Sequence, residues 1–285
     1  MKCTFSLRVL LLCLVLSFSA AYGQGNCTIR TIVGTYAFNF TGSSTIVTGA
    51  APDQFHWNAL YAPIAGVGVF TVTSSFPRGG GTADGSYWMI AGAMNSGLTP
   101  IPFHATISVK PDCTGVMNYT FGSAPMSEYM LVLDNGNEIR SVALQTAMPT
   151  GTWITTARRV GGACTQNKVT GSYLYACKSI IPLDPDNTFA VAFLMPVNIS
   201  SDGKFTGTFT GKAGPAPLVE VPVNGTVKAN ADCTADVALN FQGSQSVAKA
   251  VFLNEGKEAY LVPLVNNPGG PQIYGYCDIM QIANR

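Results

Sequence analysis

Histidine is the first residue type to examine for acid–base chemistry, and this chain has only His56 and His104. His56 follows Asp53 in the stretch Asp-Gln-Phe-His-Trp, and an Asp–His pair at this spacing could transfer protons. We favour a simpler interpretation, in which this stretch is a loop packed on Trp57. His104 lies in an apolar, strand-like stretch. Two histidines so far apart do not predict a metal site, and we expect neither a metal nor another cofactor.

Carboxylates offer a second route to catalysis, because a glycosidase uses a pair of them on either side of the bond that it cleaves. Glu128, Asp134 and Glu138 lie close together in the sequence. Asp134 and Glu138, however, flank a predicted turn, where charged side chains are normally solvated. We therefore do not favour a glycosidase.

Two common motifs of nucleotide binding and hydrolysis are missing from the sequence. Three glycines follow Arg78, but this stretch lacks the Gly-Lys-Ser/Thr ending of a phosphate-binding loop, and no helix is predicted after it. The Gly-x-Ser-x-Gly elbow of α/β hydrolases does not occur. Enzymatic activity stays uncertain, and we favour a protein without it.

Aromatic residues give the better lead to a function. They are concentrated between residues 55 and 88, where they could line an apolar cavity or form a platform for stacking on sugars. Ordinary core packing is the alternative. If a small apolar ligand is bound, we expect residues 50–63 to cover it and these residues to contact it: Phe55, Trp57, Tyr61, Tyr87 and Trp88.

The first residues are typical of a secretory signal. Lys2 and Arg8 precede an apolar stretch, residues 9–18, about half as long as the roughly 20 residues of a membrane-spanning helix. The small residues Ala21 and Gly23 then mark a cleavage site. We predict that residues 1–23 are a signal peptide and that the protein is secreted, or periplasmic in a Gram-negative host. An uncleaved anchor is the alternative, and no later stretch predicts an integral membrane span.

Charge excludes one group of partners. Without residues 1–23 the chain is nearly neutral, and charged residues make up only 11% of the whole sequence. Such a chain offers no basic surface for nucleic acid or anionic lipid. In a eukaryotic host, five Asn-x-Ser/Thr triplets would be glycosylation sites on the surface: Asn26, Asn39, Asn118, Asn198 and Asn224.

The chain contains an internal repeat, because three short landmarks occur twice in the same order. A repeat of this length indicates a duplicated structural unit. We therefore predict two homologous units, residues 24–160 and 164–285. The landmarks are Gly34-Thr35-Tyr36 with Gly171-Ser172-Tyr173, Asp112-Cys113-Thr114 with Asp232-Cys233-Thr234, and residues 133–138 with residues 253–258.

Each unit has the texture of a β protein. Apolar and β-branched runs recur about every 8–15 residues and are separated by Gly, Pro, Asn and Asp clusters. The 30 glycines and 17 prolines also argue against long helices. About eight short strands can close into a small barrel with room for packed side chains or one small ligand. We predict an all-β protein of two tandem antiparallel meander barrels, with two β-sandwiches as the alternative.

The Gly-x-Tyr at the start of each unit, followed by a meander, resembles the calycin superfamily, which includes the lipocalins. That resemblance implies an arginine on the last strand that packs over the aromatic ring, and Arg158 or Arg159 fits in the first unit. The second unit departs from it, because no arginine follows Cys277 until Arg285. Tyrosine also stands where these barrels have tryptophan. The Gly-x-Tyr and Asp-Cys-Thr-Gly motifs together resemble small exported proteins of unknown function from soil bacteria.

Removal of residues 1–23 leaves six of the eight cysteines. An even number in an exported chain predicts disulfides, although six cysteines allow 15 pairings. The repeat favours one bridge in each unit, Cys27–Cys113 and Cys164–Cys233. Cys177 and Cys277 then remain, on the first and last strands of the second unit, where a bridge would seal the barrel. Reactive or metal-binding cysteines are the alternative, but no Cys-x-x-Cys occurs.

Two functions are compatible with these features. The first is a secreted protein whose barrel, chiefly the first, binds a small apolar ligand. The second is a structural or surface-interaction protein, in a matrix or in adhesion, with solid cores. The size and the lining of each barrel interior distinguish the two.

Overall fold

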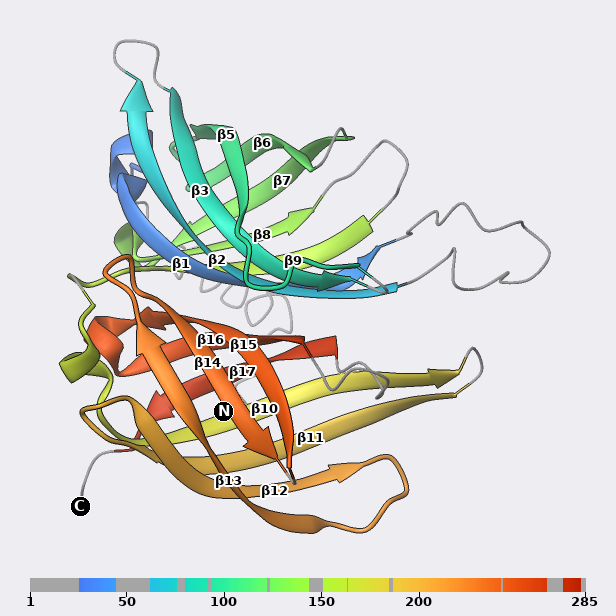
Figure 1. Ribbon diagram of the computed structural model, residues 1–285. Helices are drawn as coiled ribbons and strands as arrows, with labels where there is room; N and C mark the ends of the chain where they lie inside the picture. Colours follow the sequence, from blue (N-terminus) through green and yellow to red (C-terminus); the bar gives the residue numbers. More distant parts are fainter. Residues whose placement is uncertain are drawn as a thin grey trace, which may run out of the picture.

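A computed structural model describes residues 26–44, 62–75, 80–91, 94–121, 124–143, 151–162, 164–184, 187–241, 243–265 and 274–282. The predicted signal peptide lies outside these residues. The described chain is nearly all β and forms two closed antiparallel barrels, one after the other in the sequence (Figure 1). The prediction of tandem meander barrels is confirmed, and the sandwich alternative is wrong.

The first barrel consists of β1 (Gly34–Ser44), β2 (Ala62–Ser75), β3 (Gly80–Ala91), β4 (Met94–Asn95), β5 (Ile101–Val109), β6 (Thr114–Phe121), β7 (Ala124–Leu133), β8 (Glu138–Ala143) and β9 (Gly151–Arg159). Neighbours in sequence are neighbours in the sheet, and β1 closes the ring by pairing with β9. β4 has only two residues, pairs with the end of β3 and is not one of the strands that close the barrel.

The second barrel consists of β10 (Gly171–Asp184), β11 (Asn187–Ile199), β12 (Lys204–Ala213), β13 (Val219–Ala229), β14 (Thr234–Phe241), β15 (Ser244–Leu253), β16 (Glu258–Val265) and β17 (Tyr274–Gln281). It closes in the same way, through β10 and β17. Four short 3-10 helices complete the described elements: η1 (Ile29–Ile32), η2 (Asp134–Gly136), η3 (Gln166–Val169) and η4 (Asn254–Gly256).

The three predicted disulfides are present, Cys27–Cys113, Cys164–Cys233 and Cys177–Cys277. The third joins directly opposed residues of β10 and β17, as predicted for the closing seam. Three disulfides indicate an oxidising compartment. Among the described residues, no helix is long and apolar enough to cross a membrane.

Each barrel has an apolar core of its own. In each, a tyrosine of the first strand donates a hydrogen bond to the short 3-10 helix before the second-last strand. In the first barrel, η2 lies so close to η1 that a Cβ on Gly136 would stand 2.0 Å from the Thr31 carbonyl oxygen. Glycine is therefore required there. The Tyr36 hydroxyl donates to the Gly136 carbonyl at 2.5 Å, and Arg159 Nη2 donates to the same carbonyl at 3.1 Å.

Of the two arginines at the end of β9, Arg159 is the one that packs over the Tyr36 ring. Its Cζ lies 5.2 Å from the centre of the Tyr36 ring. It also donates to the Val33 and Thr31 carbonyls, at 2.5 and 2.9 Å. Burial raises the pKa of Tyr36 to about 12, and the nearby Arg159 charge partly offsets that effect. Arg158, one residue earlier, points elsewhere and pairs with Glu138.

The second barrel repeats this arrangement without the arginine. The Tyr173 hydroxyl donates to the Gly256 carbonyl at 2.9 Å. Gln281 pairs with Tyr173 across the strands, as Arg159 pairs with Tyr36. Gln281 Nε2 donates to the Thr170 carbonyl at 3.1 Å. Glutamine therefore occupies the position for which the sequence offered no arginine.

This difference predicts unequal costs for two matched substitutions. Tyr36→Phe leaves the Gly136 carbonyl bonded to Arg159, and we expect a loss of about 1 kcal/mol or less in the free energy of unfolding. Tyr173→Phe removes the donor of a buried carbonyl, and we expect a loss of about 2 kcal/mol. Urea unfolding of both variants tests this. A larger loss for Tyr36→Phe would show that Arg159 does not stand in for the missing hydroxyl.

The two barrels pack side by side through a third apolar cluster. Strands β1, β2 and β3 of the first barrel contact β15, β16 and β17 of the second (Figure 1). Arg158 adds a polar link, because its Nη1 lies 3.0 Å from Glu258 Oε2. The interface thus joins two separate cores. Its buried members are Ala37, Ala65, Val67, Trp88 and Ile90 from the first barrel and Val251, Leu253, Tyr260, Val262 and Leu264 from the second.

Candidate functional site

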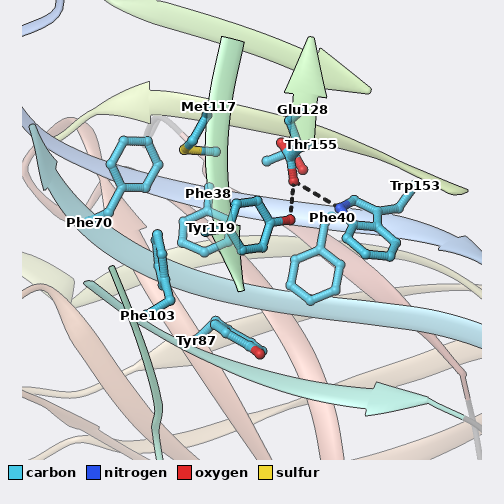
Figure 2. A pocket seen from close by; sticks show the side chains of 10 residues that line it. All are labelled: Phe38, Phe40, Phe70, Tyr87, Phe103, Met117, Tyr119, Glu128, Trp153 and Thr155. Carbon is cyan, nitrogen blue, oxygen red and sulfur yellow. Dashed lines mark hydrogen bonds between the residues drawn. The ribbon is translucent and has the colours of Figure 1, made fainter. Parts of the chain in front are cut away.

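The interior of the first barrel holds a small cavity with an aromatic wall. Its volume is about 40 Å³. Seven strands contribute side chains to it, and one of these carries a carboxylate (Figure 2). The lining residues are Phe38, Phe40, Phe70, Tyr87, Phe103, Met117, Tyr119, Glu128, Trp153 and Thr155.

Strand alternation explains why these side chains point inward. Successive residues of a strand face opposite sides of the sheet. On β7, Met126, Glu128, Met130 and Val132 are all buried, and the residues between them are at least partly exposed. Glu128 therefore occupies an inward position in an otherwise apolar series.

Glu128 is only 3% exposed, and three neutral groups donate to its carboxylate. The Tyr119 hydroxyl lies 2.7 Å and Trp153 Nε1 2.9 Å from Oε1, and Figure 2 shows both bonds. The Ser141 hydroxyl donates to Oε2. The donors belong to β6, β9 and β8, so closure of the barrel assembles the network.

The aromatic rings around the cavity contact one another at edges and tilted faces. Phe40 meets Tyr87 edge to face at a centroid distance of 6.0 Å, and Phe38 meets Phe103 in the same way at 6.1 Å. Such arrangements stabilise a defined ring geometry. Five of the ten lining residues are Phe or Tyr from β1, β2, β3 and β5, with Tyr119 and Trp153 added from β6 and β9, so aromatic rings form most of the wall.

Glu128 is the only acidic or basic side chain among the described residues that line the cavity. Burial and the adjacent Glu128 charge raise the pKa of Tyr119 far above its usual value, and burial raises that of Tyr87 to about 12. Both phenols therefore stay neutral at physiological pH. Among the described residues, no Lys, Arg or His lines the cavity, and none of the ion pairs includes Glu128.

The hydrogen-bonded ladder between β5 and β6 stops short of the first residues of β5. Their ladder joins residues 105–109 to residues 115–119. Residues 101–104 of β5 pair with β3 along one edge, but their other edge has no partner on β6. Phe103 and Tyr119 stand on this side and are only partly buried. The other eight lining residues are buried, so these two rings are the part of the wall nearest to solvent.

The second barrel lacks this polar network at the same positions. Met117 pairs with Glu128 across β6 and β7, and Val237 pairs with Ala248 across β14 and β15. The registers place Ala248 at the position of Glu128. They also place Leu239 at the position of Tyr119, Leu261 at that of Ser141 and Gly275 at that of Trp153.

A disulfide stands in the second barrel at a position that lines the cavity in the first. Thr155 pairs with Phe40 across β9 and β1, and Cys277 pairs with Cys177 at the corresponding place. Both cysteines are buried, at 4% and 5% exposure. The duplicated fold thus has a polar, aromatic interior in one copy and an apolar, cross-linked interior in the other.

The residues that the sequence predicted for a ligand site are separated by the structure. Tyr87 lines the cavity. Trp88, its neighbour on β3, faces the opposite way and lies in the interface between the barrels. Phe55, Trp57 and Tyr61 lie outside the described residues, as does His56.

Other sequence candidates do not meet at the cavity. His104 is a strand residue as predicted, and its Nδ1 lies 2.6 Å from Asp84 Oδ1 on the exposed outer face. Glu138 pairs with Arg140 and Arg158 outside the barrel, far from the buried position of Glu128. Of the five Asn-x-Ser/Thr sites, Asn39 is only 8% exposed, and the exposed ones are Asn26, Asn118, Asn198 and Asn224.

Sequence reasoning missed the role of Glu128 and its three donors. One signal was available, because Met126, Glu128, Met130 and Val132 alternate along one strand. A carboxylate among the inward-facing apolar residues of a strand costs free energy to bury unless it is hydrogen-bonded or paired, so its presence predicts polar partners nearby. The partners themselves carry no comparable signal.

Comparisons with known proteins give no family. No protein-family model matches the chain, and no curated protein sequence matches it. Three solved structures share low similarity with it. A candidate AttH of Nitrosomonas europaea is 6% identical, with a TM-score of 0.30 over 87% of this chain and 92% of that one.

The other two structures are similarly distant. A double mutant of Transferrin Binding Protein B from Haemophilus parasuis is 8% identical, with a TM-score of 0.35 over 88% of this chain and 76% of that one. A protein of unknown function from the DUF3598 family of Nostoc punctiforme is 7% identical, with a TM-score of 0.27 over 90% and 99%. We draw neither fold nor function from scores this low.

Proposed function

We propose that this protein is an exported binding protein whose first barrel takes up a small, largely apolar ligand. The observation that carries the proposal is the difference between the two copies. The same fold closes around alanine, leucine and a disulfide in the second barrel. In the first barrel it keeps an aromatic cavity around a buried carboxylate.

Export and domain organisation form part of the same proposal. Residues 1–23 are removed as a signal peptide, and units 24–160 and 164–285 each contain one barrel. The disulfides support an oxidising destination, extracellular or periplasmic. The contact of Arg159 with Tyr36 supports a calycin-like origin of the first barrel. The second barrel serves as a filled scaffold.

Binding requires the cavity to open. Pockets for small molecules usually measure about 300–1,000 Å³, far above the space present here. Phe103 is partly exposed and stands beside the end of the β5–β6 ladder, so outward rotation of its ring would admit a ligand without breaking the hydrogen bond from Tyr119 to Glu128. The ligand that fits with least change is about the size of one aromatic ring with a short chain.

Titration calorimetry with propylbenzene tests the proposal. We expect saturable binding by the intact protein and a loss of about 10-fold or more in affinity for Thr155→Phe, which fills the cavity. Ile154→Phe is the matched control, because Ile154 is the neighbour of Thr155 on β9, is 62% exposed and points outward. Native mass spectrometry of gently purified protein provides a second measurement, as a mass increment that solvent extraction removes. Absence of both signals contradicts the proposal.

A further inference from the structure

We propose that the ligand of the first barrel is an amphipathic amine, held as its ammonium ion by Glu128. This inference rests on the proposed function and names the chemical class of its ligand. A primary ammonium group would donate a hydrogen bond to the carboxylate, and the apolar part of the molecule would extend between the aromatic rings toward Phe103 and Tyr119.

The first argument is that Glu128 forms no ion pair with any described residue. An ionised carboxylate buried in a protein is normally paired with a cation. Here Tyr119, Trp153 and Ser141 supply hydrogen bonds but no charge. Within the part of the chain that the structure describes, a ligand cation is the partner that this site lacks.

The second argument is the acceptor capacity that remains. A carboxylate offers about four lone-pair positions, two on each oxygen. Tyr119 and Trp153 both donate to Oε1, and Ser141 alone donates to Oε2. Oε2 therefore keeps one acceptor position, and Glu128 forms part of the cavity wall. A single N–H donor from a ligand satisfies it.

The third argument is the aromatic wall. Ring faces attract cations and disfavour anions, most strongly where water is excluded. Phe38, Phe40, Phe70 and Tyr87 are all buried at the cavity. The aromatic wall and the carboxylate therefore both favour a positively charged ligand over a neutral or anionic one.

The fourth argument is that the barrel fold does not require the hydrogen-bond network around Glu128. Ala248, Leu239 and Leu261 occupy the corresponding positions in the second barrel, which closes with the same strand order. An eight-stranded barrel of this type thus forms without the polar network. The network of the first barrel is consequently an addition to the fold, placed at its cavity.

The test uses three probes on the intact protein at neutral pH: phenethylamine and propylbenzene, which have nearly equal shape, and 3-phenylpropionate, which adds a carboxylate to the same phenethyl group. By titration calorimetry we expect phenethylamine to bind about 10- to 100-fold more tightly than propylbenzene, the range of a charge-assisted hydrogen bond. We expect 3-phenylpropionate to bind weakest. Glu128→Gln should remove the preference for the amine and leave the affinity for propylbenzene within about 3-fold.

Two further variants keep the outcome decisive. Asp84→Asn removes an exposed carboxylate from the outer face of the same barrel and should change no affinity. Ser141→Ala keeps Glu128 and frees a second position on Oε2, so it should preserve or strengthen amine binding even if Glu128→Gln fails to fold.

The outcomes separate the two proposals. If neither phenethylamine nor propylbenzene binds, the proposed function is wrong. If propylbenzene binds as tightly as the amine, or Ser141→Ala abolishes the amine preference, the binding function stands and the inference about amines is overturned.

Discussion

Replacing Cys177 and Cys277 together with alanine is expected to lower the free energy of unfolding by about 4.7 kcal/mol, the chain-entropy value for a loop of roughly 100 residues. The two cysteines are separated by 100 residues and join the first strand of the second barrel to its last. Without the bridge, the unfolded chain gains freedom, and the seam between β10 and β17 is held by hydrogen bonds and packing alone. Urea unfolding under non-reducing conditions measures the loss.

The Cys27–Cys113 bridge provides a matched control. Its sequence separation is 86, so the entropic cost of removing it should be nearly the same. It ties the segment before β1 to the turn before β6 and spans no closing seam. We therefore expect amide exchange to accelerate along β10 and β17 in the Cys177/Cys277 variant and not in the control. A loss below about 1 kcal/mol in the first variant would show that the seam does not need its cross-link.

Trp88→Ala is expected to cost about 3–5 kcal/mol of unfolding free energy, the range for removing a large buried aromatic side chain. Trp88 is 4% exposed at the interface between the barrels, and its Nε1 donates to the Leu98 carbonyl at 2.9 Å. Lys249 Nζ lies 4.3 Å from the centre of its ring. Lys249 is itself 4% exposed and bonds Asp236 at 2.7 Å. The substitution thus removes packing and part of the compensation for a buried cation.

Scanning calorimetry distinguishes this effect from simple loss of packing in one core. We expect the Trp88→Ala protein to unfold in two separate transitions, because the barrels keep their own cores and lose the largest side chain of the contact that couples them. Trp88→Phe retains an aromatic face for Lys249 and should cost less than half as much. A single transition with an unchanged midpoint would contradict the role of Trp88 in coupling.

The duplication and the disulfides could be predicted because their signals lie in short stretches of sequence. Cys113 and Cys233 each stand in an Asp-Cys-Thr turn and share a left-handed backbone, with φ of 67° and 66°. Because the turn itself requires this backbone conformation, the same three residues occur in both copies and can be recognised in the sequence. Pairing them within each unit then left Cys177 and Cys277 for the seam.

The cavity could not be predicted in the same way, because it depends on which face each strand turns inward. Tyr87 and Trp88 are adjacent, yet one lines the cavity and the other lies in the interface. Arg158 and Arg159 diverge for the same reason. A shift of one residue in register exchanges the two faces of a strand, and register is fixed only when the barrel closes.

The contact between the barrels is heterologous, because the opening strands of one unit meet the closing strands of the other. Such a contact leaves one copy of each face vacant, and repetition of it would generate a filament. The strand registers place Lys212 on the vacant face of the second barrel where Ile90 stands in the interface, and Arg140 on that of the first where Tyr260 stands. A lysine and an arginine, the latter paired with Glu138, therefore stand where the interface has Ile90 and Tyr260, which disfavours repetition of this contact by a further copy.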